Sequence, residues 1–405
     1  MASTEKESKC PAIQWDYLAG GCPAHSGYDR IADIAKLGPV LDIEPTDVYP
    51  GYFMATDFAT ITEVLQDPQR FSSSAVVALE PDPPYKWIPE MLDPPEHTTW
   101  RKLLAPFFTP AAVANKYDSL VRARCVELID NLIASDTIDF TNEFARQYPT
   151  TVFLEIFGLP RDDFEQFMEW EGAIMHSTSE HDPDRSKMRA AMDSVLAYFA
   201  ELIAKRRADP SLLGDDVLSA ALTWEIDGEP VRDQDLLAFC LFVFIAGLDT
   251  VTAQLGYMFL HLATHDEHRE RIIEDPSIAP KAVEELLRAY PIVVTGRKAT
   301  VDTELAGVPI RAGETIMVPL QAAGRDEDQY PHPETVDFDR KITRHIAFGV
   351  GPHRCLGSHL ARLELRVALE EWHRRIPNYS LANPDITEHT AGTWGVDQLL
   401  LKVQR

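Results

Sequence analysis

The chain has 405 residues, of which 45% are hydrophobic and 25% are charged, and its formal net charge is −26. This composition is typical of a globular protein that is large enough to bury a substantial core. Because so much negative charge repels polyanions, it argues against nucleic acid and against an anionic membrane surface as partners.

The longest apolar run, residues 236–248, is too short to span a bilayer, and the polar residues 1–9 contain no signal core. We therefore expect a cytoplasmic protein without membrane insertion. The five cysteines are odd in number, and no two of them form a Cys-x-x-Cys pair. Their spacing indicates neither a disulfide framework nor a zinc site.

Hydrophobic periodicity and turn residues predict the order of elements along the chain. Helices are expected at 28–37, 57–65, from 94 onwards, 110–134, 142–157, 161–176, 184–207, 232–261, 265–273, 279–290 and 356–371. Strands are expected at 39–44, at 51–55 and within 300–320. Two irregular segments separate these elements, the proline-rich residues 74–95 and the polar connector 177–183.

These elements predict a mainly α protein with small β-sheets, built as a single domain over residues 1–405. An extended leader occupies residues 1–26. The α-rich part spans about residues 97–290, and the β-rich parts span about 39–55 and 291–320 together with the C-terminus.

One loop, Phe348-Gly-Val-Gly-Pro-His-Arg-Cys355-Leu-Gly357, places a cysteine directly before a helix. The positive end of the helix and its unpaired N–H groups favour a thiolate, so we expect a lowered pKa for Cys355. Gly349 and Gly351 allow a tight turn, and Gly357 allows a large group to lie against the start of the helix. Phe348 can shield the sulfur from water.

Four shorter patterns accompany this loop, and each is common by chance. They are His97-x-x-x-Arg101, Ala246-Gly-Leu-Asp249-Thr250, Glu285-x-x-Arg288 and an isolated Arg297. In the second pattern, Gly247 weakens the helix and the Thr250 hydroxyl can bond the carbonyl of Ala246. The expected result is a local opening of the long helix with a polar notch.

The cysteine loop resembles the haem-binding loop of the cytochromes P-450, and the four other patterns occur in the order found in that family. The resemblance implies the family's triangular helical prism, with a long central helix over the haem. It looks closest to soluble, bacterial, ferredoxin-dependent members. It also implies heme b (iron protoporphyrin IX) as cofactor and insertion of one atom of O2 into a C–H bond.

The resemblance assigns roles residue by residue. Cys355 would be the thiolate ligand of iron, with Phe348 and Gly357 beside it. The haem propionates would be bound by His97, Arg101, Arg297 and His353. Asp249 and Thr250 would deliver protons during oxygen activation. Glu285 and Arg288 would form a buried brace with Arg340.

The substrate pocket implied by the resemblance is mostly apolar and draws on Tyr85, Trp87, Val243, Ala246, Gly247, Val293, Val294, Thr295, Trp394 and Val396. This wall predicts a hydrophobic substrate of small to medium size, such as a terpenoid or a branched or fatty lipid. The chain contains no fused flavin or iron–sulfur module, so a ferredoxin with its reductase is the expected electron donor for a monomeric enzyme. Its docking patch would use Arg101, Arg344, Arg354 and Arg362.

Two alternatives share the same haem–thiolate centre. One is a peroxygenase or peroxide-rearranging enzyme, and the other is a haem–thiolate sensor or binding protein without turnover. The acid–alcohol pair at Asp249 and Thr250 counts against both, because neither needs delivery of protons to oxygen.

Overall fold

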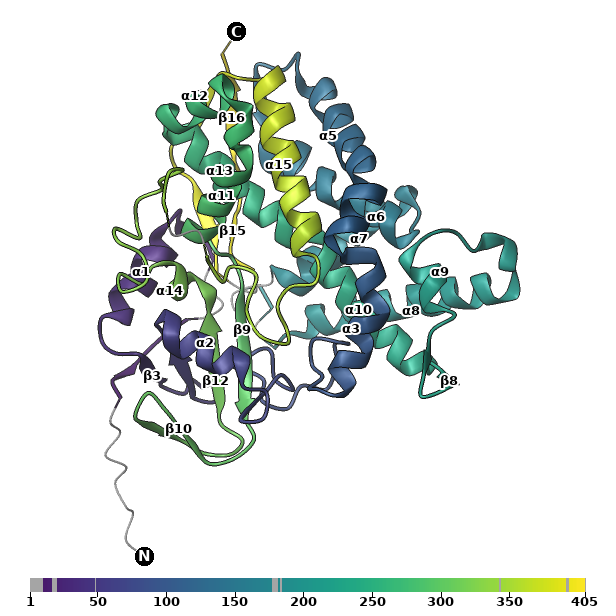
Figure 1. The fold of residues 1–405 in the computed structure, drawn as a ribbon, viewed down its shortest axis with the longest axis vertical. Coiled ribbons are helices and arrows are strands. Elements are labelled where there is room, and N and C mark those ends of the chain that lie inside the picture. Colours follow the sequence, from purple (N-terminus) through teal and green to yellow (C-terminus); the bar gives the residue numbers. More distant parts are fainter. Residues whose placement is uncertain are drawn as a thin grey trace, which may run out of the picture.

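The computed structural model describes residues 10–16, 20–47, 49–176, 181–182, 184–341, 344–390 and 393–404. Most helices gather on one side of the molecule, and the main sheet lies on the other side with the N-terminal helices (Figure 1). The first nine residues of the expected leader and most of the connector 177–183 lie outside the described residues.

The described part of the chain contains fifteen α-helices. They are α1 (Ser26–Ala35), α2 (Phe58–Gln66), α3 (Glu96–Phe108), α4 (Pro110–Ala112), α5 (Asp118–Leu132), α6 (Gln147–Phe157), α7 (Phe164–Met175), α8 (Ser186–Ala208), α9 (Val217–Ala221), α10 (Asp233–Leu248), α11 (Thr250–Thr264), α12 (Asp266–Glu274), α13 (Ala279–Ala289), α14 (Leu320–Gly324) and α15 (Ser358–Arg375).

The main sheet has six strands in the order β1-β3-β4-β12-β9-β5. Their bounds are β1 (Ala12–Ile13), β3 (Val40–Ile43), β4 (Tyr52–Ala55), β12 (Thr315–Pro319), β9 (Val294–Ala299) and β5 (Phe71–Ser72). Strand β12 runs antiparallel to β9 and parallel to β4, so the sheet joins N-terminal strands to strands from residues 294–319.

The smaller sheets are short hairpins and three-stranded ribbons. They contain β2 (Cys22–Pro23), β6 (Thr137–Asp139), β7 (Glu225–Ile226), β8 (Glu229–Pro230), β10 (Thr303–Leu305), β11 (Val308–Ile310), β13 (Tyr379–Leu381), β14 (Thr387–His389), β15 (Gly395–Val396) and β16 (Leu400–Val403). Strand β14 pairs with both β15 and β2, which brings the C-terminal region against the leader.

The helical half is held by aromatic packing around α15, which runs beside α5 (Figure 1). Trp372 of α15 is fully buried and packs edge-on against Phe140, Phe144 and Phe259. Large buried side chains of this kind each contribute about 1.5–3 kcal/mol through the apolar surface that they remove from water. They fix α15, and with it the loop that precedes it.

Helices α10 and α11 together form the central apolar segment, Asp233–Thr264. The most apolar stretch of 18 residues in this segment has a mean hydropathy of 2.2. By length and composition alone, the segment could therefore cross a membrane. The run 236–248, used above to argue against a membrane span, is only the middle of this segment, whose length agrees with the helix expected at 232–261. The segment runs through the hydrophobic core, where an all-round apolar helix is expected.

The structure differs from the expected elements at three informative places. The long helix expected at 232–261 is divided at Asp249, where the polar notch was expected. The helix expected from residue 142 begins at Gln147, because residues 140–145 form a wider turn that the Asp139 side chain caps. The leader also contributes β1 and β2 to two sheets, so part of it is paired rather than merely extended.

Candidate active site

A cavity of about 420 Å³ lies between the central helices, strand β9 and the cysteine loop. Most of its wall is apolar. The expected site residues that line it are His97, Arg101, Arg297, Phe348, His353, Cys355, Gly357, Thr250, Trp87, Val243, Ala246, Gly247, Val293, Val294 and Thr295. The fold therefore brings residues from widely separated segments to one chamber.

The cysteine loop is a tight turn that only glycine allows. Gly349 and Gly351 have φ angles of 68° and 78°, and a Cβ on Gly351 would lie 2.4 Å from the carbonyl oxygen of Leu65. The Cys355 N–H donates to the Phe348 carbonyl at 2.8 Å, which closes the turn. A Cβ on Gly357 would meet only the Cys355 sulfur, at 4.0 Å, so space remains at this position for a large group.

The expected lowering of the Cys355 pKa is wrong in sign for the protein chain alone. Burial raises the pKa of this thiol, and burial outweighs the Gly357 N–H and the Arg101 guanidinium, which both lower it. The sulfur faces an apolar chamber, where a charge is poorly solvated. A cation bound against the sulfur would favour the thiolate.

Four cationic or potentially cationic side chains gather at one end of the cavity: His97, Arg101, Arg297 and His353. The rings of His97 and His353 lie close together, with centres 3.9 Å apart and planes tilted by 35°. The Arg297 guanidinium is buried and forms no ion pair within the described residues. Its Nη1 donates to the Gly296 carbonyl at 2.6 Å and to the Thr295 hydroxyl at 3.2 Å. Burial lowers the pKa of Arg297, and the nearby acids Glu90 and Asp93 only partly oppose it.

Among the described residues that line the cavity, Glu90 is the acid near His353. It was not among the residues expected from the sequence. Its Oε2 lies 3.7 Å from His353 Nδ1, too far for a hydrogen bond. In the described structure, His97 Nδ1 and both ring nitrogens of His353 form no hydrogen bond. Buried polar atoms normally have partners, so these orphaned groups fit an anion that carries carboxylates.

Another part of the wall is formed at the junction of α10 and α11. The Thr250 hydroxyl lines the cavity and donates to the carbonyl of Ala246 at 3.2 Å. Gly247 lies against Phe153 so closely that a Cβ would come within 2.3 Å of its ring. Asp249 is buried but does not line the cavity, and its Oδ1 pairs at 3.0 Å with Nε2 of His176.

Three residues expected in the pocket lie elsewhere. Tyr85 stacks on Trp87, and its hydroxyl donates to Glu80, so only Trp87 reaches the cavity wall. Trp394 and Val396 are buried in the core and do not line the cavity. In extended chain, alternate side chains point to opposite faces, and here Thr393 faces the cavity instead.

Comparison with known proteins decides the family. The model of the family described as "Cytochrome P450" matches residues 52–376, which is most of the chain. The chain belongs to the cytochrome P450 family. As a P450 it is an oxidoreductase of the monooxygenase type, and its cofactor is heme b, which members bind through a cysteine thiolate.

Several relatives match over most of their length. The mycinamicin IV hydroxylase/epoxidase of Micromonospora griseorubida is 34% identical over 86% of this chain and 89% of its own. The steroid C26-monooxygenase of Mycolicibacterium smegmatis is 32% identical over 82% of both chains. A solved structure of a P450 EryK mutant with erythromycin B superposes with a TM-score of 0.83 at 30% identity, covering 93% of this chain and 96% of that one.

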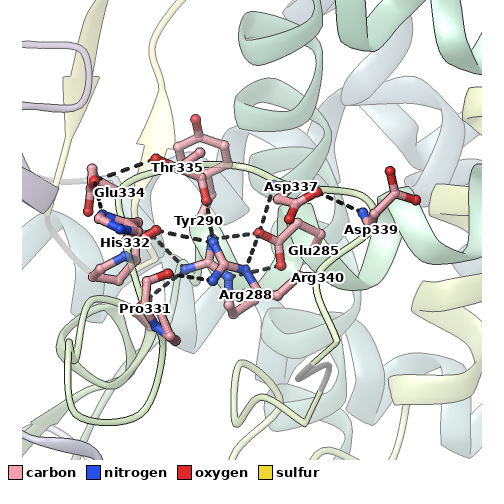
Figure 2. A network of polar contacts seen from close by, with 12 residues as sticks. Glu285, Arg288, Tyr290, Pro331, His332, Glu334, Thr335, Asp337, Asp339 and Arg340 are labelled. Carbon is pink, nitrogen blue, oxygen red and sulfur yellow. Dashed lines mark hydrogen bonds and ion pairs between the residues drawn. The ribbon is translucent and has the colours of Figure 1, made fainter.

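This P450 also contains a buried ion-pair network centred on Glu285, Arg288 and Arg340 (Figure 2). Glu285 on α13 accepts from Arg288 at 2.8 and 3.0 Å and from Nε of Arg340 at 2.9 Å. Both guanidinium groups then bond backbone carbonyls of residues 331–335, a segment without regular secondary structure. The network therefore holds an irregular segment by its backbone.

The four arginines expected in a docking patch separate into two kinds. Arg101 turns inward, lines the P450 cavity and donates to the carbonyl of Arg354 at 2.7 Å. Arg362 is bound by both oxygens of Glu284 and lies over the ring of Phe348. Arg344 and Arg354 are exposed. Two of the four arginines expected in the patch are therefore exposed.

Proposed function

We propose that this cytochrome P450 hydroxylates a medium-sized hydrophobic molecule and receives its electrons from a ferredoxin with its reductase. One observation carries the proposal: a single apolar cavity joins the Cys355 loop, the cationic end and the Thr250 hydroxyl. When bound there, heme b would supply the activation of O2 for insertion into a C–H bond.

We propose that two sets of residues hold the haem. Cys355 would bind the iron, and the Gly357 N–H that faces its sulfur would stabilise the thiolate. His97, Arg101, Arg297 and His353 would neutralise the propionates. This assignment is supported by the orphaned ring nitrogens and by the buried Arg297, which has no ion-pair partner among the described residues, since a buried charge is costly until it gains an opposite charge.

The proton-handling role falls to Thr250 and Asp249. The Thr250 hydroxyl is at the cavity wall, and its bond to Ala246 leaves the oxygen able to accept from a donor in the cavity. Asp249 lies at the helix break, directly before Thr250 in the chain and behind the cavity wall. Rotation of its carboxyl group would carry a proton from the buried side to the hydroxyl side of the break.

The substrate assignment rests on the cavity and on the relatives. Among the residues that the structure describes, the apolar wall offers no cation without an acidic partner outside the propionate end, because Arg185 is paired with Glu80 at 2.6 Å. The related proteins are named for mycinamicin IV, for a steroid and for vitamin D3. We therefore extend the expected terpenoid or lipid substrates to other bulky hydrophobic molecules that carry few charges, including steroids and macrolides.

The electron donor would approach the side of the cysteine loop. Arg344 and Arg354 are exposed there on a chain whose net charge is −26. A local positive patch on an acidic protein gives orientation to an acidic partner such as a ferredoxin. We propose a monomeric, cytoplasmic enzyme that meets its ferredoxin transiently.

Optical spectroscopy of the purified haem-loaded protein tests the central assignment. The reduced carbonyl complex should show the red-shifted Soret band of thiolate-ligated haem, and Cys355→Ala should abolish it. A screen of steroids, macrolides and terpenoids for a low- to high-spin shift should identify binders. Product formation with ferredoxin and its reductase would separate an enzyme from a haem–thiolate sensor, and turnover with peroxide alone would support the peroxygenase instead.

A further inference from the structure

The carboxylate of Asp249 is connected to a partner that no local pattern in the sequence indicates. Nε2 of His176, at the end of α7, lies 3.0 Å from Asp249 Oδ1 and 2.8 Å from Glu171 Oε1. Asp249 and Glu171 are both buried. The two acids therefore converge on one nitrogen of one imidazole.

The other nitrogen of His176 continues toward the surface. Its Nδ1 lies 2.8 Å from Nε2 of His389 in β14, and Nδ1 of His389 lies 2.8 Å from Oδ1 of Asp397. The Asp397 side chain is 35% exposed, and its other oxygen accepts from Thr387 at 2.6 Å. Hydrogen bonds thus connect buried Asp249 to an exposed carboxylate through two rings.

The charges around His176 favour its protonated form. Burial alone would lower the pKa of His176, but Asp249 and Glu171 outweigh burial and raise the pKa well above its usual value. Burial would raise the pKa of Asp249, yet the charge and hydrogen bond of His176 leave it lowered. Burial raises the pKa of Glu171, against which His176 and Arg146 act.

One proton arrangement satisfies every short contact in this group. A protonated His176 donates from Nε2 to the acids and from Nδ1 to His389. His389 must then accept at Nε2, and it donates from Nδ1 to Asp397. Asp397 therefore selects the tautomer of His389, and His389 in turn orients the ring of His176.

We propose that His176 returns a proton to Asp249 in each turnover, and that His389 and Asp397 act as positioning residues for its ring. The proposal rests on the proposed proton-handling role of Asp249. In the step, the Nε2–H bond of His176 breaks and an O–H bond forms at Asp249 Oδ1. The step transfers a proton and involves no oxidation or reduction. Solvent then returns a proton to His176, whose side chain is 26% exposed.

The backbone around His389 is built to keep this ring in place. A Cβ on Gly395 would lie 2.7 Å from Cε1 and 2.8 Å from Nε2 of His389. Strand β14 pairs His389 with Gly395 directly, so no other residue leaves room for the ring at this register. The side of the ring that faces His176 is thus defined by main chain as well as by Asp397.

The first test compares variants in steady-state turnover with the ferredoxin system. We expect His176→Gln to lower kcat by about 10- to 100-fold, with KM and the reduced carbonyl band unchanged, since general acids contribute at least this much. Asp397→Asn should give a smaller loss in the same direction. The surface histidine variant His332→Gln, whose side chain is 85% exposed, is the matched control. Equal kcat in His176→Gln and the wild type would overturn the proposal.

The Asp249→Asn variant separates failure of this inference from failure of the proposed function. If Asp249→Asn lowers kcat and raises peroxide release while His176→Gln does neither, the role of Asp249 stands and the role of His176 is refuted. If Asp249→Asn changes neither quantity, the proton-handling part of the proposed function fails, and the role of His176 fails with it.

The second test uses a readout that does not depend on turnover. Nitrogen-15 NMR of the diamagnetic reduced carbonyl protein should show His176 charged above pH 7, and Asp397→Asn should lower that titration midpoint. In turnover, the wild-type kcat should fall as pH rises through the same midpoint, because only protonated His176 can donate. His176→Arg, which keeps the charge but does not titrate, should lack that fall. A neutral His176 at pH 6, or identical profiles for both proteins, would contradict the proposal.

Discussion

Nε of Arg340 donates to Oε1 of Glu285 across 2.9 Å, and the same oxygen accepts from Arg288. One buried carboxylate therefore compensates two guanidinium groups. Breaking a buried pair costs about 3–5 kcal/mol because the remaining charge has no partner. We expect Glu285→Gln, which keeps the size of the side chain, to lower the free energy of unfolding by that amount.

Denaturant unfolding followed by circular dichroism measures this loss, and haem content per chain should fall with it. Glu334→Gln is the control, because the Glu334 side chain is 64% exposed in the neighbouring segment. Equal loss in the two variants would show that Glu285 is no more than a surface charge.

Thr250→Ala should uncouple the reaction without blocking it. The hydroxyl is the polar group of α11 that both lines the cavity and bonds Ala246. Its removal should leave oxygen consumption within about twofold of the wild type, and product should drop by about tenfold or more in favour of peroxide. Peroxide and product yields per reductant consumed are the measurement. Thr252→Val is the control, because Thr252 bonds Ala145 and Leu248 on another side of the same helix.

Glu364 gives the protein a pH-dependent stability. Burial raises the pKa of Glu364 to about 8, while an unfolded chain has the ordinary value near 4.3. The folded state therefore binds a proton that the unfolded state has lost, and stability should fall as pH rises from about 5 to 8. Glu364→Gln should remove this fall and stabilise the protein at pH 8. Melting temperatures of both proteins across that range decide it, and parallel curves would refute the assignment.

Charge reversal should reveal the electron-donor face. Arg344→Glu should slow reduction by ferredoxin by about tenfold at low ionic strength and less at high salt, since exposed charges steer association and are screened. Stopped-flow reduction gives the rates. Lys205→Glu, on α8 and 63% exposed, is the control for net charge. If both variants slow reduction equally, the effect comes from total charge and not from this face.

Gly351→Ala should disrupt haem binding far more than Gly307→Ala. Both glycines have positive φ angles, but a Cβ on Gly351 meets the Leu65 backbone at 2.4 Å, whereas Gly307 has open space. Gly307→Ala should therefore cost only about 1 kcal/mol of backbone strain. Haem retention after gel filtration distinguishes the two, and comparable retention would argue against the close approach at Gly351.

The sequence predicted the parts of the site that local patterns encode. Cys355, the two-residue pattern at His97 and Arg101, and the break at Asp249 each have a signature over a few residues. Glu90, His176 and His389 have none, because they reach the site only through tertiary packing. A lone histidine or glutamate in a sequence is more often an ordinary buried or surface residue.

The prediction that Trp394 and Val396 line the pocket was wrong for a different reason. The segment was correctly associated with the cavity, because Thr393 lines it and forms a bridge with Val293. The face was wrong, since a shift of one residue exchanges the two sides of an extended chain. Trp394 accordingly packs against Tyr28, with ring centres 5.1 Å apart. Register of this kind is set by the partner strands, which a single sequence does not name.

The approach of Gly351 to Leu65 has a consequence for how the metal ligand is located. Leu65 belongs to α2, which packs against strand β12 of the main sheet. The loop therefore contacts both halves of the molecule: Gly351 approaches α2, and the end of the loop continues into α15. The position of the Cys355 sulfur therefore depends on how the two halves pack together. Substitutions that change the packing of α2 should change the reduction potential of the iron even though they leave the cavity-lining residues unaltered.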